Sequence, residues 1–466
     1  MATRRLFRRR APLIASVLGL FLLYHFFSTL EPQSRHSQPI DERSGSPCPP
    51  LPGMEDVLVV LKTGVTEAKD KVPVHFDTTL RCVPNFVIFS DFAEEIQGVR
   101  VHDALANMDE EVKRSVPDFD IYNRIQELGR AGLERDDFAD EANSAIGKPN
   151  NPGWKLDKWK FLPMVQETLK YKGDAKWYVF MEADTYFSWP TLLEWLAHFD
   201  QTKPWYIGTE TQIADVIFAH GGSGFAVSNP AMQLVADAYT TRNVELNEYT
   251  DIHWAGDCVL GKVLFDVGVP LHYSWPILQN SNVGELDQFT QGFYRRPWCF
   301  PAVAFHHLQA KDIKDLWAFE TQRWRAVRFL KKTFFIFFYI STDTPQAEQA
   351  AQTRSIFRPQ LTRKRILLHS DIFKELIFPA LSGSREKWDN LSNEEHSEVS
   401  SFHECQRLCE QIDECTQFAI RERKCYTGKS PRLGVAHNNA RSGWLVPRVE
   451  KMMNSAPSCS TIEWGA

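Results

Sequence analysis

The sequence predicts an α/β protein with a mostly parallel central sheet, followed by a small α+β module held together by disulfides. Short uninterrupted apolar runs, typical of strands buried on both faces, alternate with segments of helical periodicity, and this predicts the sheet. Four of the nine cysteines lie within residues 405–425, and this predicts the module. A net charge of −6 argues against a dedicated nucleic-acid binder.

The first 53 residues are expected to fix the chain in a membrane. Residues 1–10 hold five arginines, and the uncharged stretch 11–30 would span about 30 Å as a helix, the thickness of a bilayer core. We interpret it as an uncleaved anchor, with a cleaved signal peptide as the alternative. The arginines favour a cytoplasmic tail and a lumenal body. Residues 31–53, rich in Pro and Ser, are expected to form a stem.

Residues 54–325 are expected to form the α/β domain. Predicted strands lie at 57–61, 86–89, 98–102, 177–181, 205–208 and 218–228. Predicted helices lie at 156–172, from 190 onward, and at 257–267. Sheets of this type bind ligands at the carboxyl ends of their strands.

Residues 326–400 show no sustained period and are expected to be linker and irregular structure. The apolar run 333–340 is too short to cross a membrane. Asn390 begins the single Asn-x-Ser/Thr tripeptide of the chain. In a lumenal domain we expect it at the surface as a glycosylation site.

Glu182 and Asp184 follow the predicted strand 177–181 directly. Paired carboxylates at such a strand end suit a hard divalent cation, which takes oxygen ligands. A metal there can neutralise charge on a departing phosphate. The alternative is an exposed pair of turn carboxylates.

Three further segments carry candidate chemistry. Glycines in the segment 218–225 allow a close approach to a ligand, or form a tight hairpin. Asp257 opens a predicted helix, where it can act as a general base or simply cap the helix. His306 and His307 follow an apolar run and are either metal ligands or structural histidines.

Six segments in order resemble the Fringe and core-1 β1,3-galactosyltransferase branch of the β1,3-glycosyltransferases. They are LVVLKTG (58–64), NFVIFSD (85–91), WYVFMEADTY (177–186), FAHGGSGFAVS (218–228), GDCVLG (256–261) and AFHHL (304–308). The resemblance covers about residues 54–310 and implies a GT-A-type glycosyltransferase domain. The family's Asp-Asp-Asp motif is Glu-Ala-Asp here.

The resemblance implies a role for each matching residue. Asp184 and His306 would hold a divalent cation, and this mixed donor set suits Mn²⁺. Asp257 would be the general base. The residues implied for the donor are Thr63, Lys69 or Lys71, Asp91 and Glu182, with Gly221 and Gly222 shaping the sugar pocket. A shared cation requires the carboxyl of Asp184 and the imidazole of His306 to lie within about 8 Å of each other.

The function implied is that of a type II enzyme of the Golgi or ER membrane. It would transfer a hexose or N-acetylhexosamine from a UDP-sugar to a hydroxyl of a glycan or glycoprotein, forming a β1,3 linkage with inversion. Two alternatives remain on the same sequence. One is an inactive lumenal chaperone or carbohydrate-binding protein, and the other is a cell-surface adhesin with an inert body.

The segment SFHECQRLCEQIDECTQFAIRERKCY (401–426) resembles a PAN/apple domain, expected over 401–460. The resemblance implies the pairs Cys405–Cys425 and Cys409–Cys415, whereas the residues alone allow three pairings. In a lumenal compartment such cysteines form disulfides, and in the cytosol they would suggest zinc. Five cysteines remain, so one is left free or bridges two chains as a disulfide-linked dimer.

Overall fold

The computed structural model describes residues 48–138, 148, 150–340, 365–381 and 383–465, with the side chains of 327–340 left out. All of these belong to the compact unit Pro47–Ala466. The expected tail, the expected anchor 11–30 and the stem as far as residue 47 lie outside the described residues. Within the described ranges, no helix is both long and apolar enough to cross a bilayer.

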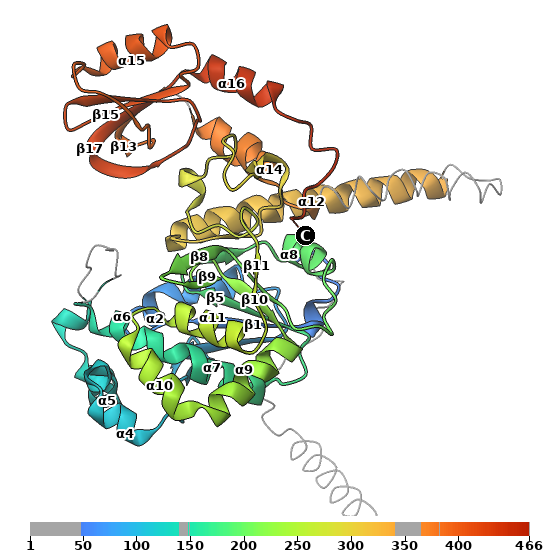
Figure 1. The fold of residues 1–466 in the computed structure, drawn as a ribbon. Helices are drawn as coiled ribbons and strands as arrows, with labels where there is room; N and C mark the ends of the chain where they lie inside the picture. The colour runs from blue at the N-terminus through green and yellow to red at the C-terminus, as the bar shows by residue number, and fades with distance from the viewer. Residues whose placement is uncertain (1–47, 139–147, 149, 341–364, 382, 466) are drawn as a thin grey trace, which may run out of the picture. The chain divides into compact units, whose positions relative to one another are not determined.

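An eight-stranded mixed sheet forms the centre of the first domain (Figure 1). Its spatial order is β11 (Leu271–Tyr273), β7 (Tyr206–Gly208), β10 (Phe225–Ser228), β5 (Trp177–Glu182), β1 (Val57–Lys62), β2 (Phe86–Ser90), β4 (Val99–Asp103) and β3 (Glu94–Ile96). Pairs β5–β1–β2–β4 and β7–β11 are parallel, while β10 and β3 run antiparallel to their neighbours. The predicted α/β class with a mostly parallel sheet is confirmed.

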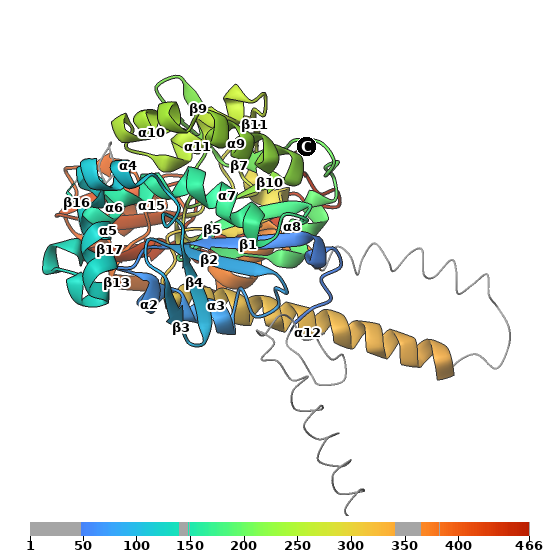
Figure 2. The same ribbon diagram turned by 90° about the horizontal axis from the view of Figure 1, so that it is seen from below.

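Both faces of this sheet are covered, which explains why its strands are apolar runs rather than alternating ones. In β1, Val57, Val59 and Leu61 point into one core while Leu58 and Val60 point into the other. Helices α7 (Phe161–Tyr171), α9 (Asn229–Thr241) and α11 (Gly256–Asp266) cover the second face, and α8 (Trp189–Leu196) covers the first. Figure 2 shows β5, β1, β2, β4 and β3 side by side.

The remaining helices are shorter or lie outside these layers. They are α2 (Ala68–Lys71), α3 (Pro73–Asp77), α4 (Glu110–Ser115), α5 (Asp120–Leu128), α6 (Pro152–Asp157), α10 (Asn243–Ile252), α12 (Ala310–Ile340), α14 (His369–Ile372), α15 (Phe402–Gln411) and α16 (Val446–Ser455).

Two small ladders complete the domain and correct one expectation. The segment 218–228 is not one strand: β9 (Val216–Ala219) pairs with β8 (Glu210–Ile213), and β10 follows after a glycine loop. A second ladder pairs β6 (Tyr186–Phe187) with β12 (Ala304–Phe305). This ladder brings residues 184 and 306 together.

The described residues of the expected linker 326–400 form regular or buried structure, while residues 341–364 and 382 lie outside the described residues. Helix α12 runs through residue 340, and the segment 366–381 lies in a buried cluster with Trp298 and Phe305. The backbone of this segment is hydrogen-bonded to the first domain, since the N–H of Ala302 donates to the carbonyl of Leu367 at 2.8 Å. The prediction was wrong because these buried residues come in short groups whose partners lie elsewhere in the chain, so no local period marks them.

The C-terminal sheet begins at residue 384, ahead of the expected boundary at 401. Its order is β13 (Ser384–Asp389), β17 (Val435–Trp444), β15 (Gln417–Arg421), β16 (Lys424–Gly428) and β14 (Glu394–His396), with α15 packed against it (Figure 1). The disulfides are Cys405–Cys425 and Cys409–Cys415, the pairs that the PAN/apple resemblance implies. Membership of that domain family stays a prediction.

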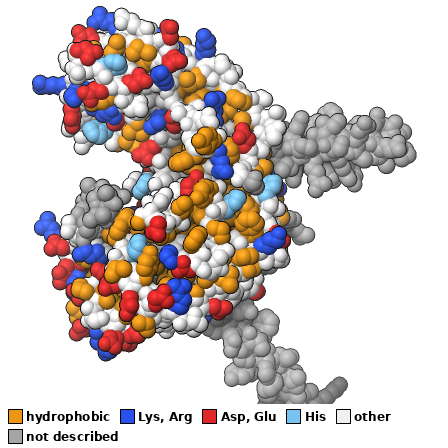
Figure 3. Space-filling view, viewed as in Figure 1, with side chains coloured by type: hydrophobic (Ala, Val, Ile, Leu, Met, Phe, Trp, Pro, Cys, Tyr) orange, Lys and Arg blue, Asp and Glu red, His pale blue; other side chains and the backbone are white. Residues whose placement is uncertain are grey.

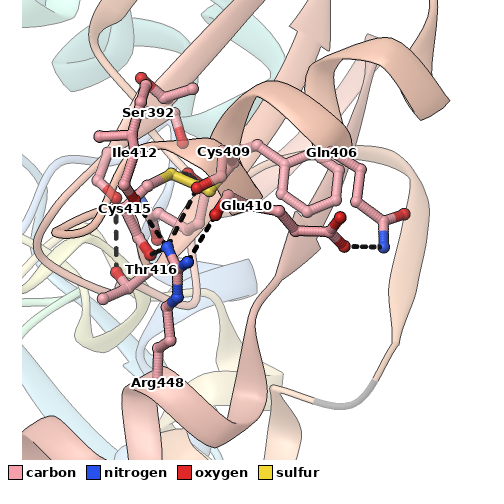
Figure 4. Close-up of a disulfide and its surroundings, with 12 residues drawn as sticks. Ser392, Gln406, Cys409, Glu410, Ile412, Cys415, Thr416 and Arg448 are labelled. Atoms are coloured by element: carbon pink, nitrogen blue, oxygen red, sulfur yellow. Dashed lines mark hydrogen bonds between the residues drawn. A yellow bond between two sulfur atoms is a disulfide. The ribbon is translucent and has the colours of Figure 1, made fainter.

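Arg448 of α16 holds the end of α15 in place (Figure 4). Its guanidinium donates to the carbonyls of Cys409, Ile412 and Cys415 at 2.6 to 3.1 Å, and to that of Glu410 at 2.6 Å. Carbonyls at the end of a helix have no partner within the helix, and a cation there also favours the helix dipole. One side chain therefore joins the small disulfide loop to the following helix.

The other cysteines correct the expectation of a disulfide-linked dimer. Cys48 pairs with Cys82, and Cys299 pairs with Cys459. The remaining thiol, Cys258, is fully buried in α11 and cannot meet a second chain without unfolding. All nine cysteines lie in the described residues, so none offers an exposed thiol for a bridge.

Asn390 is not the surface glycosylation site that its tripeptide predicts. The side chain is fully buried, and its amide donates to the carbonyls of Phe418 and Gly443 at 3.1 and 3.2 Å. A modified amide could not make these bonds or fit this space, so Asn390 is a core residue of the C-terminal sheet.

Acidic and basic side chains are interspersed over the face shown in Figure 3. This distribution agrees with a nearly balanced composition of 53 Lys and Arg against 59 Asp and Glu. Charged side chains also line a cavity, among them Lys62, Glu182 and Asp184.

Candidate active site

A cavity of about 630 Å³ lies at the carboxyl ends of β1 and β5. Its lining includes Glu182, Asp184, Gly222, Asp257 and His306. These residues come from four separate segments, each of which the sequence analysis singled out. They share one cavity, which lies at the sheet edge where α/β proteins bind ligands.

Asp184 and His306 lie against each other in this cavity. Asp184 follows β5 by two residues, and the β6–β12 ladder carries His306 back to it. Leu308 N–H donates to the carbonyl of Asp184 at 3.1 Å, which fixes the turn after β12. The imidazole Nε2 lies 3.2 Å from the carboxylate Oδ1, well within the separation that a shared cation needs.

Neighbouring groups orient both side chains. Nδ1 of His306 lies 3.1 Å from Oδ1 of Asn280, so a proton on Nδ1 leaves Nε2 free to act as a ligand. Burial alone would lower the pKa of His306, but the adjacent Asp184 raises it. Burial opposes ionisation of Asp184, yet His306 and Lys71 hold the pKa of this carboxyl well below its usual range.

The donor set fits a divalent cation. Ligand atoms of Asp184, His306 and His307 lie within 4.8 Å of one another. Oδ1 of Asp184 is buried and makes no well-aligned hydrogen bond, although Nε2 of His306 is close to it. A carboxylate with two imidazoles suits Mn²⁺ or a similar metal. The sequence offered both histidines of the pair as candidate ligands, whereas the resemblance implied His306 alone.

Asp257 lies at the start of α11 with its carboxylate directed at the glycine loop. Oδ2 accepts from the N–H of Gly221 at 2.8 Å, and Oδ1 accepts from the N–H of Cys258 at 2.9 Å. Burial chiefly raises the pKa of Asp257 to about 6, helped by the charge of Glu182, while these bonds and Lys62 lower it. A carboxyl that ionises near neutral pH inside a cavity has the properties of a general base.

The loop between β9 and β10 needs glycine for close approach. A Cβ on Gly222 would lie 2.1 Å from Cε1 of His306, and one on Gly221 would lie 3.3 Å from both Oδ2 of Asp257 and Oε1 of Glu182. The loop therefore touches the metal-site histidine and the base candidate at once. A side chain at residue 222 would displace the imidazole.

Glu182 is tied to a lysine that sequence patterns missed. Lys62, at the end of β1, forms ion pairs with Asp157 and, at 3.2 Å, with Oε1 of Glu182. Burial would lower the pKa of Lys62, but these carboxylates raise it. The sequence signal that could have identified Lys62 is a lysine at the end of an apolar predicted strand. Another lysine of the cavity lining, Lys71, lies 3.2 Å from Oδ2 of Asp184.

Four of the residues implied for the donor, Thr63, Lys69, Asp91 and Gly221, lie outside the cavity lining. Thr63 and Asp91 are buried: the Thr63 carbonyl accepts from Lys160 Nζ at 2.9 Å, and Asp91 accepts from Val65 N–H at 2.7 Å. They shape the turn after β1. Lys69 is exposed on α2, whereas Lys71 lines the cavity.

Among the comparisons with known proteins, one family model matches the first domain of this chain. The family model described as Fringe-like matches residues 53–292, more than half of the 466 residues. No curated protein gives a match. The matched region includes the sheet, the Glu-Ala-Asp segment, the glycine loop and Asp257, and it ends before His306. The chain belongs to the Fringe-like family and is, by that membership and its GT-A-like α/β domain, a glycosyltransferase.

Proposed function

We propose that this protein transfers a hexose or N-acetylhexosamine from a UDP-sugar to a hydroxyl group of a glycan or glycoprotein, forming a β1,3 linkage with inversion. The observation that carries the proposal is that Asp257, with its raised pKa, lines the same cavity as the Asp184–His306 pair. One side chain can take a proton while the pair holds the leaving-group end of the donor.

In this mechanism Asp257 accepts the proton of the acceptor hydroxyl as that oxygen attacks the anomeric carbon. The bond between the anomeric carbon and the diphosphate oxygen breaks, and its electron pair leaves with the nucleoside diphosphate. A divalent cation held by Asp184 and His306, with His307 beside them, would neutralise charge on that diphosphate. Lys71 adds a positive charge at the same end of the cavity.

Glycine and glutamate complete the donor pocket in this proposal. Gly221 donates its N–H to Asp257 and leaves room beside Glu182, so donor-sugar hydroxyls can approach the carboxylate. Lys62 holds Glu182 in place through their ion pair. Ala183 stands where the family has the central Asp of its motif, so Glu182 is the carboxylate that would contact the donor sugar.

The sequence and the disulfides support a site of action in the secretory pathway. We place the domain in the lumen of the Golgi or ER, anchored by residues 11–30 as a type II protein. Four disulfides within one chain support an oxidising compartment. Localisation of the tagged full-length protein, with protease protection of the body in intact vesicles, tests this.

A direct test uses the full-length protein with a panel of UDP-sugars and Mn²⁺. We expect metal-dependent hydrolysis of at least one UDP-sugar, and weaker UDP binding after chelation or in Asp184→Ala. The carboxylate supplies a metal ligand, so its loss removes the cation that contacts the diphosphate. Equal UDP affinity with and without metal contradicts the metal assignment.

One observation favours a second candidate, a non-catalytic lumenal chaperone or carbohydrate-binding protein. Lys62 and Lys71 pair with the two carboxylates of the Glu-Ala-Asp segment, an arrangement that is stable without a donor or a metal. This candidate predicts glycan binding without UDP binding or UDP-sugar hydrolysis. The UDP-sugar panel therefore separates the two functions.

A further inference from the structure

We propose that Trp154 and Trp254 form the platform on which a sugar ring of the acceptor stacks, and that they thereby position its hydroxyl for Asp257. This inference rests on the proposed transferase function and assigns binding residues to the acceptor side of the same cavity.

The two indoles lie together in the wall of the cavity. Their ring centroids are 5.9 Å apart with an interplanar angle of 23°, and both residues line the cavity. They come from distant parts of the chain: Trp154 lies in α6, and Trp254 lies just before α11. Both are half-buried, so part of each ring remains accessible.

Core packing does not explain this pair. The structure buries Trp159, Trp189, Trp195 and Trp298 completely, as expected for large apolar rings. Trp254 only borders a small cluster that includes Phe218, and Trp154 belongs to no hydrophobic cluster of the described residues. Partly exposed aromatic rings that line a pocket are typical of ligand-binding walls.

The chemistry of the cavity favours a sugar. A pyranose has one apolar C–H face and a rim of hydroxyl groups, and this cavity has an indole wall together with the carboxylates of Glu182 and Asp257. The apolar face can be buried on the indoles while the hydroxyls bond to carboxylates. A peptide hydroxyl has no such face.

The position of Trp254 favours the acceptor over the donor. Only two residues separate it from Asp257, the group that must receive the acceptor's proton. The diphosphate end belongs to Asp184, His306 and Lys71. An acceptor ring on the platform would therefore present its hydroxyl to the base, opposite the departing nucleotide. Stacking of the uracil base on the same indoles is the competing outcome.

The experiment compares the full-length protein with Trp154→Leu, Trp254→Leu and the aromatic replacement Trp254→Phe. The acceptor probes are methyl glycosides of galactose, N-acetylgalactosamine and fucose, assayed with whichever UDP-sugar is hydrolysed. We expect each Leu variant to raise the acceptor KM about tenfold, the cost of losing one good stacking contact, and the Phe variant to retain most of the affinity. Affinity for UDP and acceptor-free hydrolysis should not change. Phe265→Leu, an exposed aromatic of α11, is the matched control.

The outcomes are separable. Acceptor KM values within twofold of wild type in both Leu variants overturn the platform, as does an equal loss of UDP affinity, which assigns the indoles to the nucleobase. Absence of UDP binding in the wild type overturns the transferase function itself. If such a protein still binds methyl glycosides and loses that binding in the Leu variants, the indole platform stands without the enzyme.

Discussion

Asp257 makes one hydrogen bond that a helix-capping role would explain, to the N–H of Cys258, but capping does not require the burial of this side chain or its other neighbours. Exposed capping residues stabilise helices equally well. Here the carboxylate also contacts the glycine loop through Gly221 and lies in the field of Glu182. Burial and the charge of Glu182 raise the pKa, and the bond to Gly221 holds the oxygen at the glycine loop, so the proposed mechanism gives this side chain the role of general base.

Replacement of Asp257 by Asn should abolish transfer while UDP binding persists. General bases typically contribute a factor of about 10² to 10⁴ in rate, and the amide cannot accept the proton. In the wild type, kcat/KM should rise with pH through about 6, because only the ionised carboxylate is a base and its pKa is about 6. Steady-state rates from pH 5 to 8 check this, and a flat profile with normal turnover in Asp257→Asn would remove the assignment.

Gly222→Ala should weaken metal binding without unfolding the protein. The added methyl would lie 2.1 Å from the imidazole of His306, so the ring has to move away from Asp184. Gly153→Ala is the matched control, because a Cβ there meets its nearest atom at 3.4 Å in the same cavity. Calorimetric titration with Mn²⁺ should show a loss of about tenfold or more for the first variant and little change for the second.

At the scale of single residues, the sequence identified the site residues that share a strand end or a motif. It missed the residues that only tertiary packing brings to the site. Asp184 and His306 were predicted together, and they are adjacent. Lys62 was not singled out, because an ion pair to Glu182 depends on the parallel register of β1 and β5. Asn390 was assigned to the surface because a tripeptide carries no information on burial.

Elements with strong local signals were predicted, and elements stabilised by distant partners were not. The runs 57–61 and 177–181 became β1 and β5 because both faces of the sheet are covered. The segment 366–381 is buried against residues 298–305, and no window of the sequence contains both sides of that contact. Strands β13 and β14 were missed for the same reason, since their paired residues follow 29 or more positions later.

Helix α12 is joined to β6 by a buried carboxyl whose titration should be visible in stability. Glu320 accepts from Tyr186 Oη at 2.6 Å and from Ser188 Oγ at 2.5 Å. Burial raises the pKa of Glu320 from 4.5 to about 7, although these hydrogen bonds lower it. Its contribution to the free energy of unfolding is therefore complete below about pH 4.5 and is lost as pH rises through 7.

Glu320→Gln should remove that pH dependence. Relative to wild type, the free energy of unfolding of the variant should increase by up to about 3 kcal/mol between pH 4.5 and 8, since the amide stays neutral throughout. Urea unfolding at several pH values measures the difference. Asp315→Asn, on the exposed side of the same helix, should leave the wild-type dependence in place. If the difference in free energy of unfolding between Glu320→Gln and wild type does not change with pH, the buried carboxyl does not titrate in this range.

Over the whole described chain, the C-terminal sheet is not a separate appendage. Trp444 and Val449 share a buried cluster with Tyr186 and Phe305, which lie close in sequence to Asp184 and His306. Gly434 N–H donates to Gly284 O at 2.7 Å, and Arg432 pairs with Asp287 at 3.2 Å. The sequence predicted the module and its cysteines but could not predict this shared core, which joins residues more than 100 positions apart.

Loss of the Cys299–Cys459 bond should lower stability without dividing the protein. The bond closes a loop of 160 residues, for which chain entropy predicts up to about 5 kcal/mol, against about 2 kcal/mol for the six-residue loop of Cys409–Cys415. Replacing both Cys299 and Cys459 by Ser should therefore lower the unfolding midpoint more than the same change at Cys409 and Cys415. Because the shared cluster persists, calorimetry should still show one transition; two separated transitions would mean that the C-terminal sheet folds independently of the catalytic domain.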